Sequence, residues 1–273
     1  MSAYTSADGV LIALEDGVLS ITLDRPGKRN AIDDAMMSAL IDAVDAAGRD
    51  DAVRAVLLGA TGPHFCAGAD IVSRNAAGPE APEAKPRVGS IQRRLPSQAH
   101  RLVPLLLSVQ VPVVAGIRGW AAGIGLSLAL CADVTVAAQD ACFWAPFCAR
   151  GFTPDSGLTW LLPRRVGEVR ARRMLLLDEK VDAAQAVEWG LVDRVVPSED
   201  TEKAAAELAA RFASGATVAL GLTKWLMHSG TGVALGEQLR DEGFAMELSS
   251  RSRDFREGLA AFREKRPARF EGL

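Results

Sequence analysis

Apolar residues in the first half of the chain alternate between the two-residue period of strands and the longer period of helices. Residues 10–14 and 18–23 flank Asp16-Gly17, a dipeptide typical of a hairpin turn, and therefore predict two antiparallel strands. Residues 33–47 keep their apolar side chains on one helical face and are followed by Gly48, which predicts a helix and its end. Residues 53–58 form a continuous apolar run of strand length.

The same alternation continues in the middle of the chain after one interruption. Five prolines interrupt residues 75–104, which predicts a long loop followed by a helix that ends near Gln110. Residues 111–117 and 134–138 then predict strands, and residues 126–130 predict a helix between them. Strands that alternate with helices are typical of parallel pairing through right-handed crossovers, so we expect an α/β fold.

Strand signals disappear toward the end of the chain. Helical spacing marks four successive segments there, at residues 201–212, 218–228, 235–248 and 252–262. We therefore predict two parts, a βα core over residues 1–198 and a helical C-terminal segment over residues 199–273.

Composition and charge narrow the class of protein. The 273 residues carry 31 Lys and Arg against 34 Asp and Glu, a net charge of −3, which argues against a nucleic-acid partner. The N-terminus lacks a secretory signal, and the apolar stretch 119–132 is too short to span a bilayer, so no membrane association is expected. Four cysteines at 66, 131, 142 and 148 have no metal-binding spacing, which predicts free thiols in the cytoplasm and no bound metal.

Two turns rich in small residues carry most of the chemical information. Ala67, Gly68 and Ala69 follow a predicted strand, and a helix is expected to start near Asp70. The second turn, residues 118–127, has the same order of strand, glycine turn and helix. Two such turns side by side can aim two backbone N–H groups at one point, which is the geometry of an oxyanion hole. Tight packing is the alternative explanation for either turn taken alone.

The second turn also excludes two common motifs. Gly123-x-Gly125 is not a dinucleotide-binding fingerprint, because Leu128 stands where the third glycine belongs. Residues 125–129 lack the final glycine of a nucleophile elbow. A hydrolase would need Ser127 with Asp155 or Asp193 and with His228, but His228 lies in an apolar helical run that favours a structural role.

The two turns and their surroundings together resemble the crotonase (enoyl-CoA hydratase/isomerase) superfamily over nearly the whole chain. The resemblance rests on an ordered set of segments: Leu23-Asp24-Arg25-Pro26, Arg29-Asn30-Ala31, residues 65–70, residues 122–125, Cys131-Ala132-Asp133, residues 151–157, Leu162-Pro163-Arg164, residues 184–196, residues 256–262 and residues 264–267.

This resemblance implies a fold, an assembly and a ligand. The fold would be a spiral of ββα units with a helical C-terminal trimerisation segment, assembled as a homotrimer or as a hexamer. The ligand would be an acyl-CoA thioester, with coenzyme A as part of the substrate and no separate cofactor. The loop at 75–104 is expected to form a wall of the acyl pocket.

The resemblance also assigns roles to residues. The backbone N–H groups of Ala69 and Ile124 would stabilise a thioester enolate, although a branched Ile124 departs from the usual glycine or alanine and should narrow the site. Substrate contacts are expected from Lys28, Arg29, Ala67, Gly68, Asp70, Ile71, Gly123, Phe147, Phe262 and Lys265, with Lys265 reaching the site from a neighbouring subunit.

The positions of the expected acid and base decide which reaction is favoured. The two glutamates of enoyl-CoA hydratases match Ser127 and Phe147, and neither residue can act as a carboxylate base. Asp155, in residues 154–164, resembles the acid/base aspartate of the isomerase branch, and apolar neighbours at Phe147, Phe152, Leu158 and Trp160 would strengthen it as a base. The alternative role for Asp155 is that of a turn residue or helix N-cap.

We therefore expect a double-bond or ring isomerase that acts on an enoyl-CoA thioester. A single carboxylate can remove a proton from one carbon of the enolate and return it to another. A non-catalytic acyl-CoA-binding protein and an enoyl-CoA hydratase without its glutamates stay open as alternatives.

Overall fold

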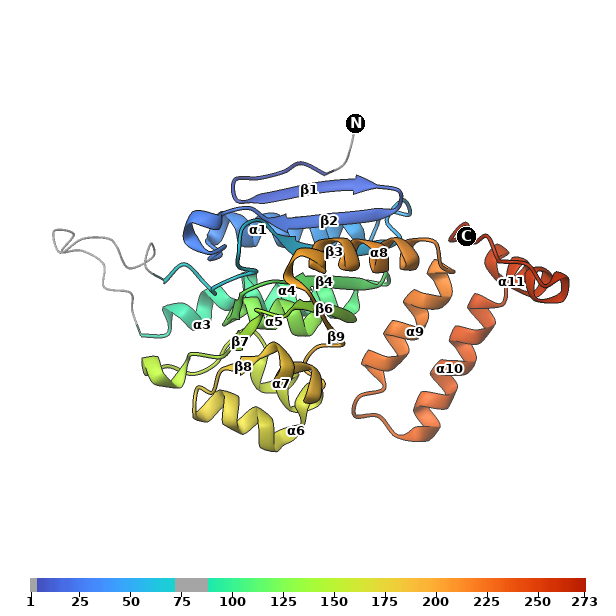
Figure 1. Cartoon of the computed structure of the whole chain (residues 1–273). Coiled ribbons are helices and arrows are strands. Elements are labelled where there is room, and N and C mark those ends of the chain that lie inside the picture. Colours follow the sequence, from blue (N-terminus) through green and yellow to red (C-terminus); the bar gives the residue numbers. More distant parts are fainter. Residues whose placement is uncertain (1–3, 72–87) are drawn as a thin grey trace.

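Two β-sheets organise the chain in the computed structural model, which describes residues 4–71 and 88–273 (Figure 1). The larger sheet has its strands in the order β1-β2-β3-β4-β6-β9. Only the β1–β2 pair is antiparallel, as the Asp16-Gly17 turn predicts, and the other pairs are parallel. These strands are β1 (Val10–Glu15), β2 (Val18–Leu23), β3 (Ala55–Ala60), β4 (Val113–Ile117), β6 (Val134–Ala138) and β9 (Arg194–Val196).

A smaller sheet holds three very short strands in the order β5-β7-β8. They are β5 (Trp120–Ala122), β7 (Cys142–Trp144) and β8 (Val181–Asp182). Strand β5 follows β4 almost directly and leads into helix α5 (Ile124–Cys131), and β7 in the same way follows β6. Each step from the larger to the smaller sheet thus makes one ββα unit, which confirms the predicted α/β spiral. Strands of two or three residues are too short for a periodic pattern, so the sequence did not reveal them.

Helices cover the larger sheet and connect the units. Helix α1 (Asp34–Ala47) begins where the Asp33 carboxylate accepts a hydrogen bond from the Met36 amide at 2.9 Å, and it buries Met36, Leu40 and Ile41. The other α-helices of the core are α3 (Ser90–Arg94), α4 (Ala99–Ser108), α6 (Leu158–Leu176) and α7 (Ala183–Glu188), and α6 is interrupted at Gly167. The 3₁₀ turns are η1 (Pro26–Lys28), η2 (Leu95–Ser97), η3 (Cys148–Arg150) and η4 (Ser198–Asp200).

Two sequence-based boundaries need correction. Strand β3 begins at Ala55 rather than at Val53, because the Val53 amide donates to the Asp50 carbonyl in a turn. The predicted loop at 75–104 is wrong for its second half, where α3 and the first part of α4 are helical. Pro104 lies inside α4, since tertiary packing of the buried Leu102, Val103 and Leu106 outweighs the missing amide donor. The first part of that loop lies outside the described residues.

The C-terminal segment consists of four helices with different surroundings. Helix α8 (Thr201–Ala213) packs Ala205 and Ala209 against the larger sheet, whereas α9 (Thr217–Ser229), α10 (Leu235–Ser249) and α11 (Arg253–Glu264) extend to one side of it (Figure 1). The four helices agree with the predicted segments. The division at residues 198/199 stays a prediction, and α8 belongs to the core by its packing. Within residues 4–71 and 88–273, no helix has both the length and the apolarity to cross a bilayer.

A partly buried ion pair fastens α9 to the core. The Lys224 ammonium lies 2.8 Å from the Asp133 carboxylate and donates to the carbonyls of Leu106 and Val111 at 3.0 and 3.2 Å. The same carboxylate accepts the Val113 amide at the start of β4. Burial lowers the pKa of Lys224, and the charge of Asp133 opposes that shift. The pair therefore joins the C-terminal arm to the edge of a core strand.

We expect Lys224→Met to lower the free energy of unfolding by about 2 kcal/mol, because Asp133 would keep a charge with only one donor left. Urea denaturation followed by circular dichroism measures the change. Lys203→Met, at an exposed position on α8, is the matched control and should stay within about 0.5 kcal/mol of the unaltered protein. Equal stabilities of the two variants would show that the partly buried pair contributes nothing.

Candidate active site

The two glycine turns lie side by side because a backbone bridge joins them. The Cys66 amide donates to the Trp120 carbonyl and the Ala122 amide donates to the Cys66 carbonyl, both at 2.8 Å. This pairing fixes the segment before Ala69 against the segment before Ile124. The predicted neighbourhood of the two turns is therefore present in the fold.

Both predicted oxyanion donors have amides without an internal partner. Ile32 bridges the residues on either side of Ala69, donating to the Gly68 carbonyl at 2.8 Å and accepting the Asp70 amide at 2.9 Å. Successive N–H groups of an extended segment point to opposite sides, so the Ala69 N–H points away from Ile32. Ile124 is the first residue of α5, where a helix leaves its amides unpaired. Neither amide forms a hydrogen bond within the part of the chain that the structure describes.

Gly123 permits the close approach of the two turns. Its φ of +55° is a left-handed value that favours glycine, and a Cβ there would lie 3.6 Å from the Gly68 Cα and 3.9 Å from the Phe147 ring. The two turns line one cavity, whose described wall residues are Ile32, Met37, Ala67, Gly68, Ala69, Ile71, Leu95, Gln98, Ala99, Gly123, Ile124, Pro146, Phe147, Arg150, Phe152, Asp155 and Ser156. Most of the residues predicted for the acyl end of the site thus share one cavity.

Asp155 lines this cavity from the loop that precedes α6. The helix is capped at Gly157 without a side-chain hydrogen bond, so the N-cap alternative for Asp155 is wrong. The Asp155 carbonyl accepts the Leu158 amide at 3.2 Å, which agrees with the other alternative, a turn residue. Its carboxylate instead accepts the Ser156 hydroxyl at 2.7 Å. Ser156 holds a φ of +54°, a conformation that costs a non-glycine residue of order 1 kcal/mol and is often found at functional sites.

The apolar surroundings expected for Asp155 are only partly present. Phe147 and Phe152 line the same cavity and meet edge to face, with ring centroids 5.4 Å apart. Leu158 is buried in the core instead, and Trp160 packs against Arg164 and His228 outside the cavity. The expectation was therefore wrong for Leu158 and Trp160, because the turn at residues 156–157 directs the helix away from the cavity.

The two positions of the missing glutamates hold no carboxylate in the folded chain either. Phe147 is nearly buried and places its ring in the cavity wall. Ser127 is fully buried on α5, and its hydroxyl has no hydrogen-bond partner. His228 stacks on Trp160 at 5.8 Å between ring centroids. Ser127 is therefore not part of a nucleophile–base pair, which removes the hydrolase alternative.

A buried thiol next to the turns is unreactive near neutral pH. Burial raises the pKa of Cys66 to about 12, so this side chain stays protonated near neutral pH and cannot act as a thiolate nucleophile. The four cysteines are free, as predicted.

Residues predicted to contact coenzyme A lie in three places. Lys28 and Arg29 are exposed in and after η1, next to the cavity, where the Arg29 carbonyl accepts the Ala67 amide at 3.0 Å. Asp70 is buried, its carboxylate pairs with Arg25 at 2.8 Å, and it is not among the described residues that line the cavity. Phe262 and Lys265 belong to α11 and its end, far from the cavity across the molecule in Figure 1. Within one chain they do not join the other predicted residues.

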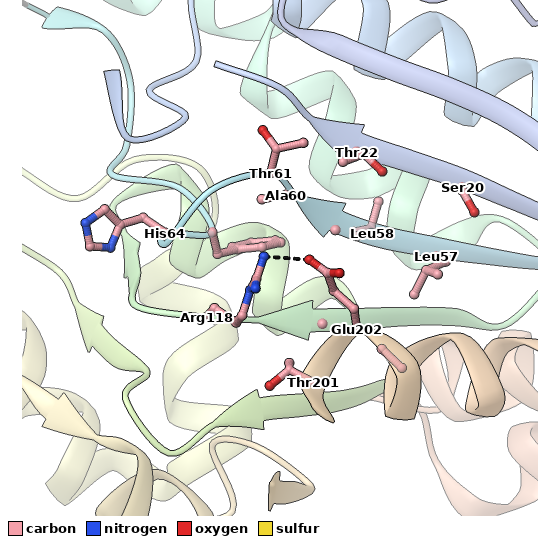
Figure 2. A pocket seen from close by; sticks show the side chains of 14 residues that line it. Ser20, Thr22, Leu57, Leu58, Ala60, Thr61, His64, Arg118, Thr201 and Glu202 are labelled. Atoms are coloured by element: carbon pink, nitrogen blue, oxygen red, sulfur yellow. Dashed lines mark hydrogen bonds and ion pairs between the residues drawn. The ribbon is translucent and has the colours of Figure 1, made fainter. Parts of the chain in front are cut away.

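A second cavity lies elsewhere, between the larger sheet and α8. Figure 2 shows Ser20 and Thr22 from β2 facing Thr201 and Glu202 from α8, with the Arg118 guanidinium 2.5 Å from the Glu202 carboxylate. Burial, followed by the charge of Arg29, lowers the pKa of His64 at its rim. None of the residues predicted for the site lines this cavity. Its two charged side chains among the described residues, Arg118 and Glu202, pair with each other, and His64 does not line the cavity that holds Asp155.

Several cavity residues were not found from the sequence. Leu95, Gln98 and Ala99 come from the predicted loop segment, as expected for a pocket wall. Arg150 was not predicted as a site residue, although it is the one cationic residue in the sequence between Phe147 and Asp155 and could have been considered for that reason. Met37 reaches the cavity through the packing of α1 and Ile32 through its backbone bridge to the segment around Ala69, and no local pattern reveals either contact.

Comparisons with known proteins agree with this geometry. The family model described as enoyl-CoA hydratase/isomerase matches residues 13–273. The 1,2-epoxyphenylacetyl-CoA isomerase of Escherichia coli is 38% identical, over 96% of this chain and 98% of its own length. The 2,3-dehydroadipyl-CoA hydratase of the same organism is 32% identical, over 96% and 98%. A solved structure from Mycobacterium abscessus, assigned to the same family, superposes with a TM-score of 0.90 at 36% identity, covering 97% of this chain and 100% of that one.

Proposed function

Because this chain belongs to the enoyl-CoA hydratase/isomerase family, we propose that it isomerises an enoyl-CoA thioester through an oxyanion-stabilised enolate. One observation carries the proposal. Asp155 is the only carboxylate among the described residues that line the cavity, and Ala69 and Ile124, whose amides have no hydrogen-bond partner within the described residues, line the same cavity. A hydratase needs a second group to place and activate water, and the two candidate positions hold Ser127 and Phe147.

The proposed reaction moves one proton. The thioester oxygen accepts hydrogen bonds from the amides of Ala69 and Ile124, which stabilise the negative charge that develops on it. Asp155 removes a proton from C2 of a 3-enoyl thioester, the electrons move onto the thioester oxygen, and the double bond shifts. The same carboxylic acid then returns the proton to C4, which yields the conjugated 2-enoyl thioester and regenerates the carboxylate.

The coenzyme A part would lie on the side of the cavity where Ala67 is tied to Arg29. Lys28 and Arg29 are cations available there for its phosphates. Contacts from Phe262 and Lys265 would come from a neighbouring subunit of a trimer or of a hexamer. The exposed apolar side chains of α10 and α11, among them Leu239, Phe244 and Leu259, support such an assembly.

The test is an activity assay on the purified protein with two substrates. We expect a 3-enoyl-CoA to be converted to its conjugated 2-enoyl isomer, which is followed by the absorbance of the conjugated thioester. Crotonyl-CoA should lose no absorbance, since water addition is not catalysed. Water addition to crotonyl-CoA without isomerisation would establish a hydratase instead. Tight thioester binding with no turnover of either substrate, or of a ring-epoxide thioester, would establish a binding protein.

A further inference from the structure

Arg150 brings an unneutralised positive charge into the cavity wall. It lies in η3, between Phe147 and Phe152, and its amide donates to the Phe147 carbonyl at 3.0 Å. No carboxylate among the described residues forms an ion pair with its guanidinium. Arg150 and Asp155 are the two charged side chains of the described wall. Asp155 has its own hydrogen bond to Ser156 and does not pair with Arg150.

The Arg150 guanidinium lies over an aromatic ring, which the Lys180 ammonium also approaches, to 4.9 Å. Its central carbon lies 5.3 Å from the centroid of the Trp144 ring, and the indole N–H of Trp144 donates to the Asp178 carbonyl at 2.9 Å. A stacked guanidinium keeps its edge N–H groups free, in a fork that matches a carboxylate. Arg150 is an exposed residue, and within residues 4–71 and 88–273 its guanidinium forms no hydrogen bond, so its donors are available to a ligand.

Arg150 shares its cavity with the residues proposed to hold the thioester. Ala67, Ala69 and Ile124 line the same cavity as Arg150, Phe147 and Phe152, so an acyl group bound there can meet the guanidinium. Arg150 and Asp155 carry opposite charges, so a substrate carboxylate added to the described wall leaves one net negative charge. Its pairing with the Arg150 guanidinium would offset part of its repulsion of the Asp155 carboxylate.

We propose that Arg150 selects acyl groups that end in a carboxylate, so that the preferred substrates are dicarboxylic monothioesters of coenzyme A. The proposal rests on the proposed function for the identity of the thioester end. It adds that a bidentate, charge-assisted contact with Arg150 discriminates against the uncharged acyl group of the same length.

The test compares two saturated thioesters that cannot be isomerised, adipoyl-CoA and hexanoyl-CoA. Titration calorimetry should show that the unaltered protein binds adipoyl-CoA about tenfold more tightly, with a preference that weakens as salt is added. Arg150→Gln should remove the preference, and Arg150→Lys should keep part of it. Arg164→Gln is the matched control, since Arg164 also stacks on a tryptophan, 3.9 Å from the Trp160 centroid, but outside the cavity.

Equal affinities for the two thioesters, or a preference that persists in Arg150→Gln, would overturn this proposal. Its failure is distinguishable from a failure of the proposed function, because the binding ratio requires no catalysis. Isomerisation of 3-enoyl-CoA without any carboxylate preference would leave the isomerase standing and remove the role of Arg150. Selective binding without isomerisation would do the reverse.

Discussion

Replacing Asp155 by asparagine is expected to lower kcat for the isomerisation of a 3-enoyl-CoA by about 10³-fold. Asparagine has nearly the same shape and can still accept the Ser156 hydroxyl, but it cannot take up and return a proton. General acid–base groups contribute roughly 10²- to 10⁴-fold to enzymatic rates, and no other carboxylate of the described cavity wall can replace this one. The loss should therefore appear in kcat, measured from the absorbance of the conjugated product.

Thioester binding separates a catalytic role of Asp155 from a structural one. The variant should bind a saturated acyl-CoA within about threefold of the unaltered protein and should unfold at the same urea concentration, because the side chain caps no helix. Asp51→Asn, at an exposed turn, is the matched control and should retain full activity. An Asp155→Asn enzyme that isomerises at the normal rate would refute the assignment of the base.

A methyl group added at Gly125 is expected to destabilise the fold and disable the site together. A Cβ at this position would lie 2.5 Å from the Cys66 carbonyl oxygen and 2.6 Å from the Cys66 Cβ. The backbone bridge between Cys66 and Ala121 must shift to make room, and that bridge aligns Ala69 with Ile124. We expect Gly125→Ala to lower the free energy of unfolding by about 3 kcal/mol, at the upper end for overpacking a core. Isomerase activity should fall at least tenfold even where the variant is fully folded.

Gly243→Ala provides the matched control for this prediction. Gly243 lies in the middle of α10 with no atom near the position of a Cβ. Alanine should therefore stabilise that helix, by up to about 1 kcal/mol, and leave activity unchanged. Urea unfolding and the isomerisation assay on both variants check the pair. A Gly125→Ala protein as stable and active as the control would show that the contact between the two turns is not required.

The sequence by itself determined the long elements and the chemical kinds of residue available. The apolar faces of residues 33–47 and 201–212 were predicted correctly because a helix of three or more turns repeats its pattern often enough to be recognised. The absence of a carboxylate at residues 127 and 147 and its presence at residue 155 are equally matters of residue identity, and together with the family resemblance they led to the prediction of isomerisation over hydration.

Which of these residues meet depends on the folded chain as a whole. The two- and three-residue strands β5, β7 and β8 exist because they pair with each other, and a separate bridge from Cys66 to Ala121 places the 66–69 turn against the 121–124 turn. Arg150 reaches the same cavity as Ala69, and Trp160 leaves it, because of turns whose backbone angles depend on packing that is remote in sequence. Local patterns report which face of an element is apolar. The distances between elements follow from close packing of the whole core, and those distances determine the site.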